Sequence, residues 1–293
     1  MGGSMKVVMT LLVRDEEDIL AANFDFHLAC GVDFFIVTDN LSVDGTRDII
    51  ESYVRQGVAS YLHEPSDDYS QFRWVTRMAR MAATDYGADW VINGDADEFW
   101  VAGNTAENIS DALASVAPQV QLLTVPRSNF GPVDEVGEGF FAERMTFRDR
   151  VSRNPDGKLL PPKVCHRAMD DIEVEQGNHG VRRGGVALAG EPGPMRILHY
   201  PMRSYRQFEN KIVRGGAAYA RNEELPRGVG LTWRNLYQLW QSGGLRAHYM
   251  EKVLLAEAIQ SRLLSGDLIY DDTLPRVLRN WRNNRIQASV ASS

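Results

Sequence analysis

Short runs of consecutive apolar residues alternate, through the first hundred positions, with stretches in which apolar residues recur every three or four positions. The short runs predict buried strands, because a strand covered on both faces has no polar side. They are residues 6–13, 34–38, 58–62 and 90–92. The spaced stretches predict helices, as where Leu20, Phe24 and Leu28 share one helical face before Gly31. This alternation predicts an α/β fold, with a mostly parallel, Rossmann-like sheet flanked by helices.

The second half of the chain follows a looser pattern. Two further strands are predicted at 122–126 and 195–199, separated by a polar, turn-rich excursion. After Pro201 the spacing becomes helical. We therefore predict one α/β domain over residues 5–203 and a C-terminal helical region, 204–293, that packs on it. Residues 1–4 read as the remnant of an expression tag.

Composition and charge limit the classes of function that are expected for this chain. The 293 residues are 44% hydrophobic and 24% charged, as in ordinary globular proteins. The net charge of −7 divides into −13 over the first 199 residues and +6 over the last 94, so specific nucleic-acid binding is not expected. Three roles are possible for the basic C-terminal portion: a homodimer contact, a peripheral membrane surface, or simply a solvated set of helix faces.

Several features favour a reducing compartment. The only cysteines, Cys30 and Cys165, are far apart and do not indicate a disulfide framework. No run approaches the length of a membrane span, and no signal peptide follows Met5. A cytoplasmic location is therefore expected.

Two carboxylates follow the fourth predicted strand directly, in the triplet Asp95-Ala96-Asp97. Ligands of such sheets bind beyond the carboxyl ends of the strands. Hard oxygen ligands at this edge suit Mn²⁺ or Mg²⁺ with a bound diphosphate, and like charges so close together need a compensating cation. The alternative is a solvated acidic turn.

A second polar segment, Asp39 to Thr46, follows the second predicted strand. Asp39 and Asn40 have groups that could hydrogen-bond a base or ribose, in the same crevice as Asp95. The alternative is a turn with a helix cap. Lys211 and Arg214, at i and i+3 on one helical face, and Lys163 are candidates for holding a diphosphate; for the two helical residues, a solvated face is the alternative.

The ordered motifs resemble those of family 2-type glycosyltransferases, in the branch whose acidic motif reads D-x-D-E-F. The motifs are Leu12-Val13-Arg14-Asp15-Glu16-Glu17-Asp18-Ile19-Leu20, Asp39-Asn40-Leu41-Ser42-Val43-Asp44-Gly45-Thr46, Asp95-Ala96-Asp97-Glu98-Phe99, and a later segment from His199 to Gly215. The first departs from the commoner pattern, with Arg14-Asp15 where Lys-Asn is usual.

The resemblance implies a GT-A fold, a nucleoside-diphosphate-sugar donor and a divalent metal at the acidic motif. It places Val13, Arg14 and Glu16 at the base pocket and Asp39 at the nucleoside. It places Asp95 near the ribose and metal, with Asp97 as the firmer metal ligand.

A late histidine often joins the metal shell in related folds. His179 and His199 are therefore candidate metal ligands, with a structural role as the alternative for each.

The predicted activity is hexosyltransferase-type transfer of a sugar, with UDP-sugars favoured as donors, to a saccharide or other hydroxyl acceptor. The resemblance favours inversion, with a carboxylate general base. Candidates for the base are Asp134, Glu135 and Glu138, and further along Asp170 and Asp171. Rival functions are a nucleotidyltransferase acting on a sugar phosphate and a non-catalytic nucleotide- or sugar-binding module.

Overall fold

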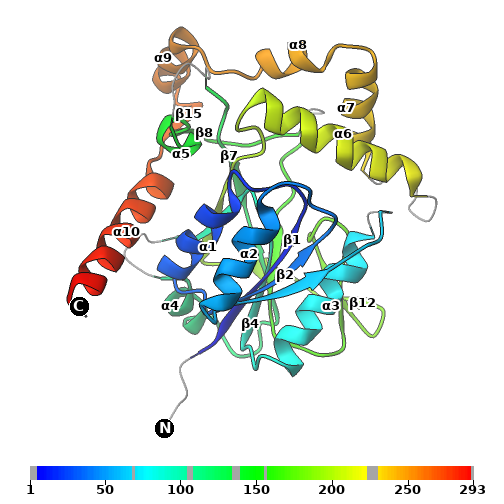
Figure 1. Ribbon diagram of the computed structural model, residues 1–293, viewed down its shortest axis with the longest axis vertical. Helices are drawn as coiled ribbons and strands as arrows, with labels where there is room; N and C mark the ends of the chain where they lie inside the picture. Colours follow the sequence, from blue (N-terminus) through cyan, green and yellow to red (C-terminus); the bar gives the residue numbers. More distant parts are fainter. Residues whose placement is uncertain are drawn as a thin grey trace.

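A seven-stranded sheet forms the centre of the molecule (Figure 1). The computed structural model of the chain describes residues 5–67, 70–103, 108–133, 139–154, 157–222 and 230–291. In spatial order the strands are β13 (Glu191–Pro192), β6 (Leu122–Val125), β9 (Lys163–Arg167), β4 (Trp90–Asp95), β1 (Val7–Val13), β2 (Phe34–Asp39) and β3 (Ala59–His63). The pairs from β4 to β3 are parallel, whereas β9 runs antiparallel to both of its neighbours.

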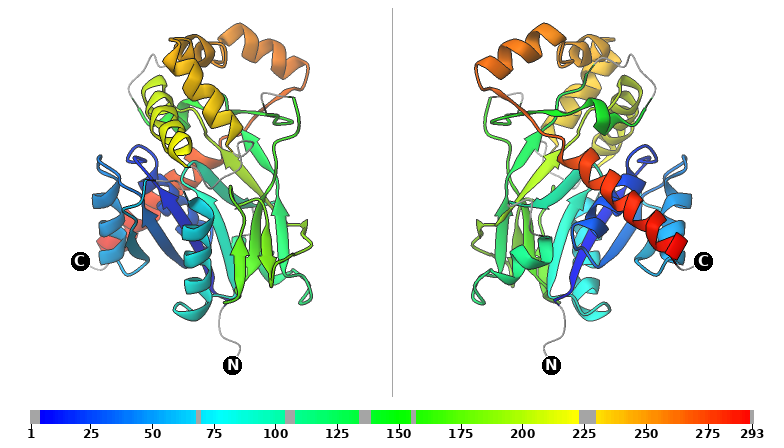
Figure 2. Two further views of the ribbon diagram at one scale, coloured as in Figure 1. Left: turned by 90° about the vertical axis from the view of Figure 1, so that its right-hand side faces the viewer. Right: turned by 90° about the vertical axis from the view of Figure 1, so that its left-hand side faces the viewer.

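Helices cover both faces of this sheet, as the side views show (Figure 2). They are α1 (Leu20–Ala29) and α2 (Thr46–Arg55) on one face and α3 (Gln71–Thr84) on the other. Side chains along β1 alternate accordingly: Met9 and Leu11 join the core under α1 and α2, and Val8 joins the core under α3. Burial on both faces explains why these strands read as continuous apolar runs.

A second sheet of three strands lies against the end of the first. Its strands are β5 (Glu98–Ala102), β14 (Met195–His199) and β7 (Arg127–Asn129). The register sets His199 opposite Glu98 on one side and beside Asn129 on the other. Because β5 begins just after the acidic triplet, this sheet brings a late part of the chain to Asp97.

Smaller elements complete the α/β part. They are α4 (Ile109–Ala114), α5 (Phe141–Arg144), the sheet of β10 (Ile172–Val174), β11 (Val181–Arg183) and β12 (Val186–Ala187), and the pair of β8 (Phe147–Asp149) with β15 (Leu268–Tyr270).

The C-terminal helices separate into two groups (Figure 1). The first group, α6 (Tyr205–Arg221), α7 (Leu231–Gln241) and α8 (Leu245–Met250), packs around a small core of its own, which includes Phe208 and Tyr249. Next come α9 (Ala256–Leu264) and α10 (Thr273–Ala291). Leu274 and Leu278 of α10 belong to the main core, where α10 packs beside α1. The division at residue 203 stays a prediction.

The predicted fold class is confirmed: a mostly parallel α/β sheet with helices on both faces and a helical C-terminal extension. Strand β9 was not predicted, because its five residues include Lys163, His166 and Arg167 and do not form an apolar run. Cys30 and Cys165 are buried free thiols. Among the described helices, none is long and apolar enough to cross a membrane.

Candidate functional site

The acidic triplet lies at the carboxyl edge of the main sheet, as predicted. Asp95 is the last residue of β4 and pairs in register with Leu12, while Asp39 ends β2 opposite Val13. The two segments therefore flank the end of β1. A Cβ at Gly94, just before Asp95, would lie 2.2 Å from Cε of Met9, so the Met9 side chain would have to move to accept a larger residue there.

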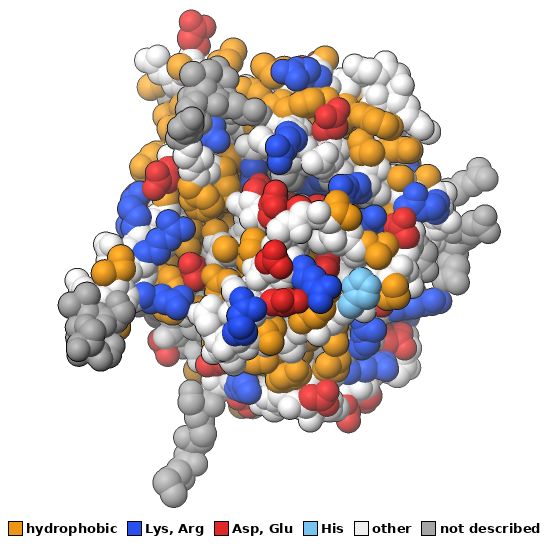
Figure 3. All heavy atoms as spheres, viewed as in Figure 1, with side chains coloured by type: hydrophobic (Ala, Val, Ile, Leu, Met, Phe, Trp, Pro, Cys, Tyr) orange, Lys and Arg blue, Asp and Glu red, His pale blue; other side chains and the backbone are white. Residues whose placement is uncertain are grey.

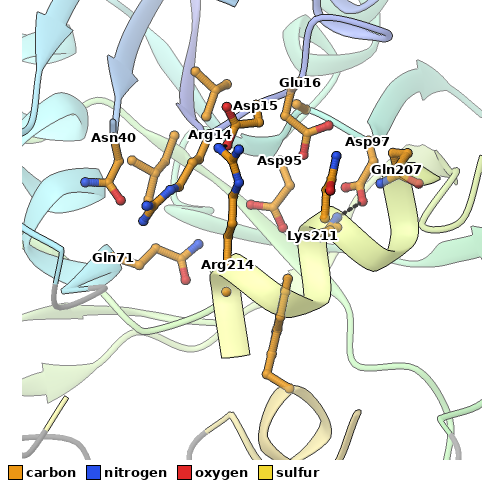
Figure 4. Close-up of a pocket in the computed structure, with 16 residues that line it drawn as sticks. Arg14, Asp15, Glu16, Asn40, Gln71, Asp95, Asp97, Gln207, Lys211 and Arg214 are labelled. Carbon is orange, nitrogen blue, oxygen red and sulfur yellow. Dashed lines mark hydrogen bonds and ion pairs between the residues drawn. The ribbon is translucent and has the colours of Figure 1, made fainter. Parts of the chain in front are cut away.

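A pocket opens at this edge, between the sheet and α6 (Figure 4). It is lined by Leu12, Val13, Arg14, Asp15, Glu16, Asn40, Gln71, Asp95, Ala96, Asp97, Gln207, Asn210, Lys211, Arg214, Gly215 and Trp233. The end of β4 and the loops after β1 and β4 contribute the acidic groups, and α6 contributes cations. In the space-filling view, acidic and basic side chains lie side by side near the middle of the molecule, below the upper helices (Figure 3).

Asp97 is paired with a lysine from α6. The Lys211 ammonium donates to Oδ2 of Asp97, whose side chain is only 3% exposed. Burial alone would raise the pKa of Asp97, but the nearby positive charges, Lys211 first among them, together outweigh burial and hold that pKa well below its usual range. Asp97 is therefore a carboxylate at neutral pH.

Asp95 is paired with a second lysine. Lys163, buried on β9, donates to Oδ2 of Asp95 at 2.5 Å and to the carbonyl of Gly177 at 2.9 Å. Asn178 donates to the other oxygen of Asp95 at 3.2 Å. The predicted charge compensation at the acidic motif is thus provided, in the described structure, by two lysines.

Behind this pair lies the fully buried carboxyl of Glu98. It is 3.5 Å from the Lys163 ammonium and 3.3 Å from the Arg127 guanidinium. Arg127 also donates twice to the carbonyl of Pro161. These ion pairs hold the Lys163 side chain in position, because it contacts the carboxyl groups of both Glu98 and Asp95. Lys163 in turn holds Asp95 in position.

His199 faces the other oxygen of Asp97. Its Nδ1 contacts Oδ1 of Asn129 at 2.7 Å, and its Nε2 is 3.7 Å from Oδ1 of Asp97. Burial lowers the pKa of His199 to about 3, so the ring is neutral. In the tautomer that donates its Nδ1 proton to Asn129 Oδ1, Nε2 carries a lone pair that faces a carboxylate oxygen. Two acceptors facing one another are suited to share a cation.

Arg203 joins the late segment to the first loop. It forms a bidentate pair with Asp18, at 2.7 and 2.8 Å, and a third contact to Glu16 at 2.7 Å, with its side chain 1% exposed. Burial raises the pKa of Glu16 to about 7 against the opposing charges of Arg203 and Lys211. Arg203 thereby holds one wall of the pocket in place.

Further ion pairs connect α6 to the sheet edge. Arg214 pairs with Asp15, and Arg221 pairs with Asp67 at 2.5 Å. Helix α6 is also packed closely against α7: a Cβ on Gly215 would lie 2.4 Å from Trp233, and one on Gly216 would lie 2.5 Å from Tyr237. The glycines thus let α7 pack closely on α6, while the cations of α6 face the acidic loops.

The structure brings together most of the predicted donor and metal residues. Those that line the pocket are Val13, Arg14, Glu16, Asn40, Asp95, Asp97, Lys211 and Arg214. Lys163 and His199 contact the triplet from behind the lining.

Other predicted residues lie outside the lining. The buried Asp39 accepts from the backbone N–H of Ser42 at 3.1 Å and so shapes its loop. His179 is held through Nδ1 by the carbonyl of Pro162 at 2.7 Å. Asp171 pairs on the surface with Arg183 at 2.8 Å.

The three favoured base candidates, Asp134, Glu135 and Glu138, lie outside the described residues. Their assignment therefore stays a prediction.

Several residues at the site were not predicted from the sequence. Glu98 belongs to the acidic motif and Arg203 to the late motif, so their positions carried a signal, but neither was assigned a role. Gln71, Gln207 and Asn210 line the pocket without any local pattern that marks them. Asn129 and Asn178 orient His199 and Asp95 from loop and strand-end positions.

No cluster of three or more His, Cys, Asp or Glu side chains in the described part of the chain forms a metal site by itself. Among the described residues, the predicted ligands Asp97 and His199 have their Oδ1 and Nε2 atoms 3.7 Å apart. A bound diphosphate would have to supply further oxygens, as the sequence predicts.

Sequence comparison identifies the family. A sequence model of glycosyltransferase family 92 matches residues 7–154, half of the chain, and the chain therefore belongs to glycosyltransferase family 92. The match contains the first three predicted motifs and ends before His199. The predicted assignment as a glycosyltransferase is thus confirmed at the level of the family.

Other comparisons add less. No curated protein matches the chain. Among solved structures, S. aureus TarS 1–349 in complex with UDP-GlcNAc is 14% identical, with a TM-score of 0.42, over 76% of this chain and 69% of that one. Glucosyl-3-phosphoglycerate synthase from Mycobacterium tuberculosis, in complex with Mn²⁺, UDP and phosphoglyceric acid, is 19% identical, with a TM-score of 0.28, over 43% of each chain. Similarities this low carry no argument about the donor of this chain.

Proposed function

We propose that this chain transfers a sugar from a nucleoside-diphosphate sugar to a saccharide or other hydroxyl acceptor, with UDP-sugars favoured as donors. The proposed reaction uses a divalent metal and inverts the configuration at the anomeric carbon. Family membership supports glycosyl transfer. The observation that carries the metal-dependent mechanism is the neutral His199 ring, whose Nε2 lies 3.7 Å from an Asp97 oxygen in a cation-flanked pocket. The narrower resemblance to the D-x-D-E-F branch of family 2-type enzymes is part of this proposal.

The donor set fits Mn²⁺ or Mg²⁺. Asp97 offers a carboxylate oxygen and His199 an imidazole nitrogen whose tautomer is fixed by Asn129. Asp95, at the end of β4, is the third candidate ligand and also lies where a ribose would be expected. Oxygen ligands suit both metals, and the imidazole suits Mn²⁺ better. When bound, the cation would supply Lewis-acid stabilisation of the negative charge on the departing diphosphate.

The remaining donor contacts come from α6 and the first loop. Lys211 and Arg214, one turn apart, place two cations at the pocket where a diphosphate can neutralise them. Val13, Arg14 and Asn40 line the side next to β1 and β2, where we assign the base and ribose. Asn40 is held by bonds from Nδ2 to the carbonyls of Glu64 and Ser66, at 3.1 and 2.6 Å.

In the proposed reaction an acceptor hydroxyl attacks the anomeric carbon from the face opposite the diphosphate. The bond to the diphosphate oxygen breaks as the new glycosidic bond forms. A carboxylate takes the hydroxyl proton. Asp134, Glu135 and Glu138 remain the candidates for this base.

The test is donor turnover in the presence of Mn²⁺. UDP-, GDP-, dTDP- and CMP-sugars are first screened for thermal stabilisation, since ligand at a hundred times its Kd stabilises by about 2.7 kcal/mol. Hydrolysis of the best donor is then compared in Asp97→Asn, His199→Gln and Asp48→Asn, the last an exposed acid on α2 that serves as control. We expect the first two to lose at least about tenfold in turnover and the control to lose none. Full turnover in both would refute the metal site.

A further inference from the structure

The two oxygens of Asp97 face different side chains. Lys211 donates to Oδ2, and the His199 lone pair faces Oδ1 across 3.7 Å. The carboxylate is 3% exposed, so water screens it little, whereas the Lys211 side chain is 24% exposed and lines the pocket. The more mobile partner of this pair is therefore the lysine.

A divalent cation on Asp97 and His199 would come close to the Lys211 ammonium. Two cations sharing one buried carboxylate repel each other strongly, because few water molecules lie between them. Lys211 cannot keep its present bond to Asp97 at full strength while a metal occupies that carboxylate. Its long, flexible stem lets it turn to another anion within the same pocket.

We infer that Lys211 changes partner when donor binds: it neutralises Asp97 in the ligand-free protein, and it moves to the donor diphosphate once a divalent metal has taken its place on Asp97. The inference rests on the proposed function. Lys211 thus competes with metal in the absence of donor and supports donor in the presence of metal. Metal alone should bind weakly, and metal with nucleotide should bind strongly.

Arg214 provides a matched control. It lies on the same helix one turn later, carries the same charge and lines the same pocket, but it pairs with Asp15 and not with the acidic triplet. Loss of either cation removes one positive charge near the metal site. Only loss of Lys211 also removes the direct contact with Asp97.

The decisive measurement is Mn²⁺ affinity in donor-free protein, by calorimetric titration of wild type, Lys211→Met and Arg214→Met, each with its melting temperature checked. We expect Lys211→Met to bind Mn²⁺ about tenfold more tightly than Arg214→Met, since a charge-assisted hydrogen bond no longer competes. Adding Asp97→Asn to Lys211→Met should abolish this gain. At saturating Mn²⁺, both single variants should bind UDP about tenfold more weakly than wild type.

Other results would overturn the inference. If Lys211→Met binds Mn²⁺ no more tightly than Arg214→Met, or binds UDP as wild type does, Lys211 does not exchange partners. If none of the proteins binds Mn²⁺, the metal site itself is absent, and the proposed mechanism fails together with the inference.

Discussion

Replacing Asn129 by leucine removes the acceptor that fixes the His199 ring. His199 Nδ1 now lies 2.7 Å from Oδ1 of Asn129, and the tautomer that donates its Nδ1 proton there leaves the Nε2 lone pair directed at Asp97, 3.7 Å away. Without that acceptor, the proton is better placed on Nε2, where it faces a carboxylate oxygen. That tautomer cannot bind a metal through Nε2.

The lost hydrogen bond is worth about 1 kcal/mol, and the wrong tautomer adds to the loss. Removal of such a supporting group typically lowers metal affinity 10- to 100-fold, or about 1.4–2.7 kcal/mol. We expect Asn129→Leu to weaken Mn²⁺ binding in this range, as measured by calorimetric titration or by the electron paramagnetic resonance signal of free Mn²⁺.

The matched variant is Asn129→Asp, which keeps an acceptor oxygen at the same position and should bind Mn²⁺ at least as tightly as wild type. The backbone N–H of residue 129 donates to Ser152 Oγ at 2.7 Å in either case, so the strand end should stay in place. Wild-type Mn²⁺ affinity in Asn129→Leu would show that His199 is not a ligand.

Two further predictions concern buried ionisable groups. Arg203→Met leaves Glu16 and Asp18 without their shared cation and should lower the free energy of unfolding by about 3–5 kcal/mol in urea titrations. The control Arg206→Met, at an exposed position, should change that free energy by less than about 0.5 kcal/mol. Equal effects of the two substitutions would contradict the role of Arg203. Burial lowers the pKa of His166 from 6.5 to about 4, so the unfolded chain binds more protons between these values and stability falls as pH is lowered through them. His166→Leu should therefore flatten the pH dependence by up to ~1.4 kcal/mol per pH unit between about pH 6.5 and 4, and an unchanged slope would refute the assignment.

The main sheet was largely predictable from the sequence because its signals are local. The apolar run ending at Val13 forms β1, and that ending at Ile92 forms the first half of β4. An acidic triplet directly after such a run must lie at the carboxyl edge of a parallel sheet. The positions of Asp95 and Asp97, and their nearness to Asn40, follow from this rule alone.

The charge balance of the site was not predictable in the same way. The sequence indicates that two adjacent carboxylates need a cation, and a metal was the expected one. The structure supplies Lys163 from an antiparallel strand 68 positions from Asp95, and Lys211 from a helix 114 positions from Asp97. The sequence predicts Lys163 and Lys211 as diphosphate contacts. It does not reveal that these lysines pair with Asp95 and Asp97.

By itself, then, the sequence determined the α/β class, the edge at which the acidic triplet lies and the assignment as a glycosyltransferase, while the predicted family 2-type branch stays a proposal. Each of these follows from residues close together along the chain. The tertiary structure decided which cations neutralise the triplet, which ring nitrogen of His199 faces Asp97, and how α6 is fixed over the pocket. These depend on strand register and on ion pairs between distant segments, and local apolar periodicity carries no information about which distant side chains will meet.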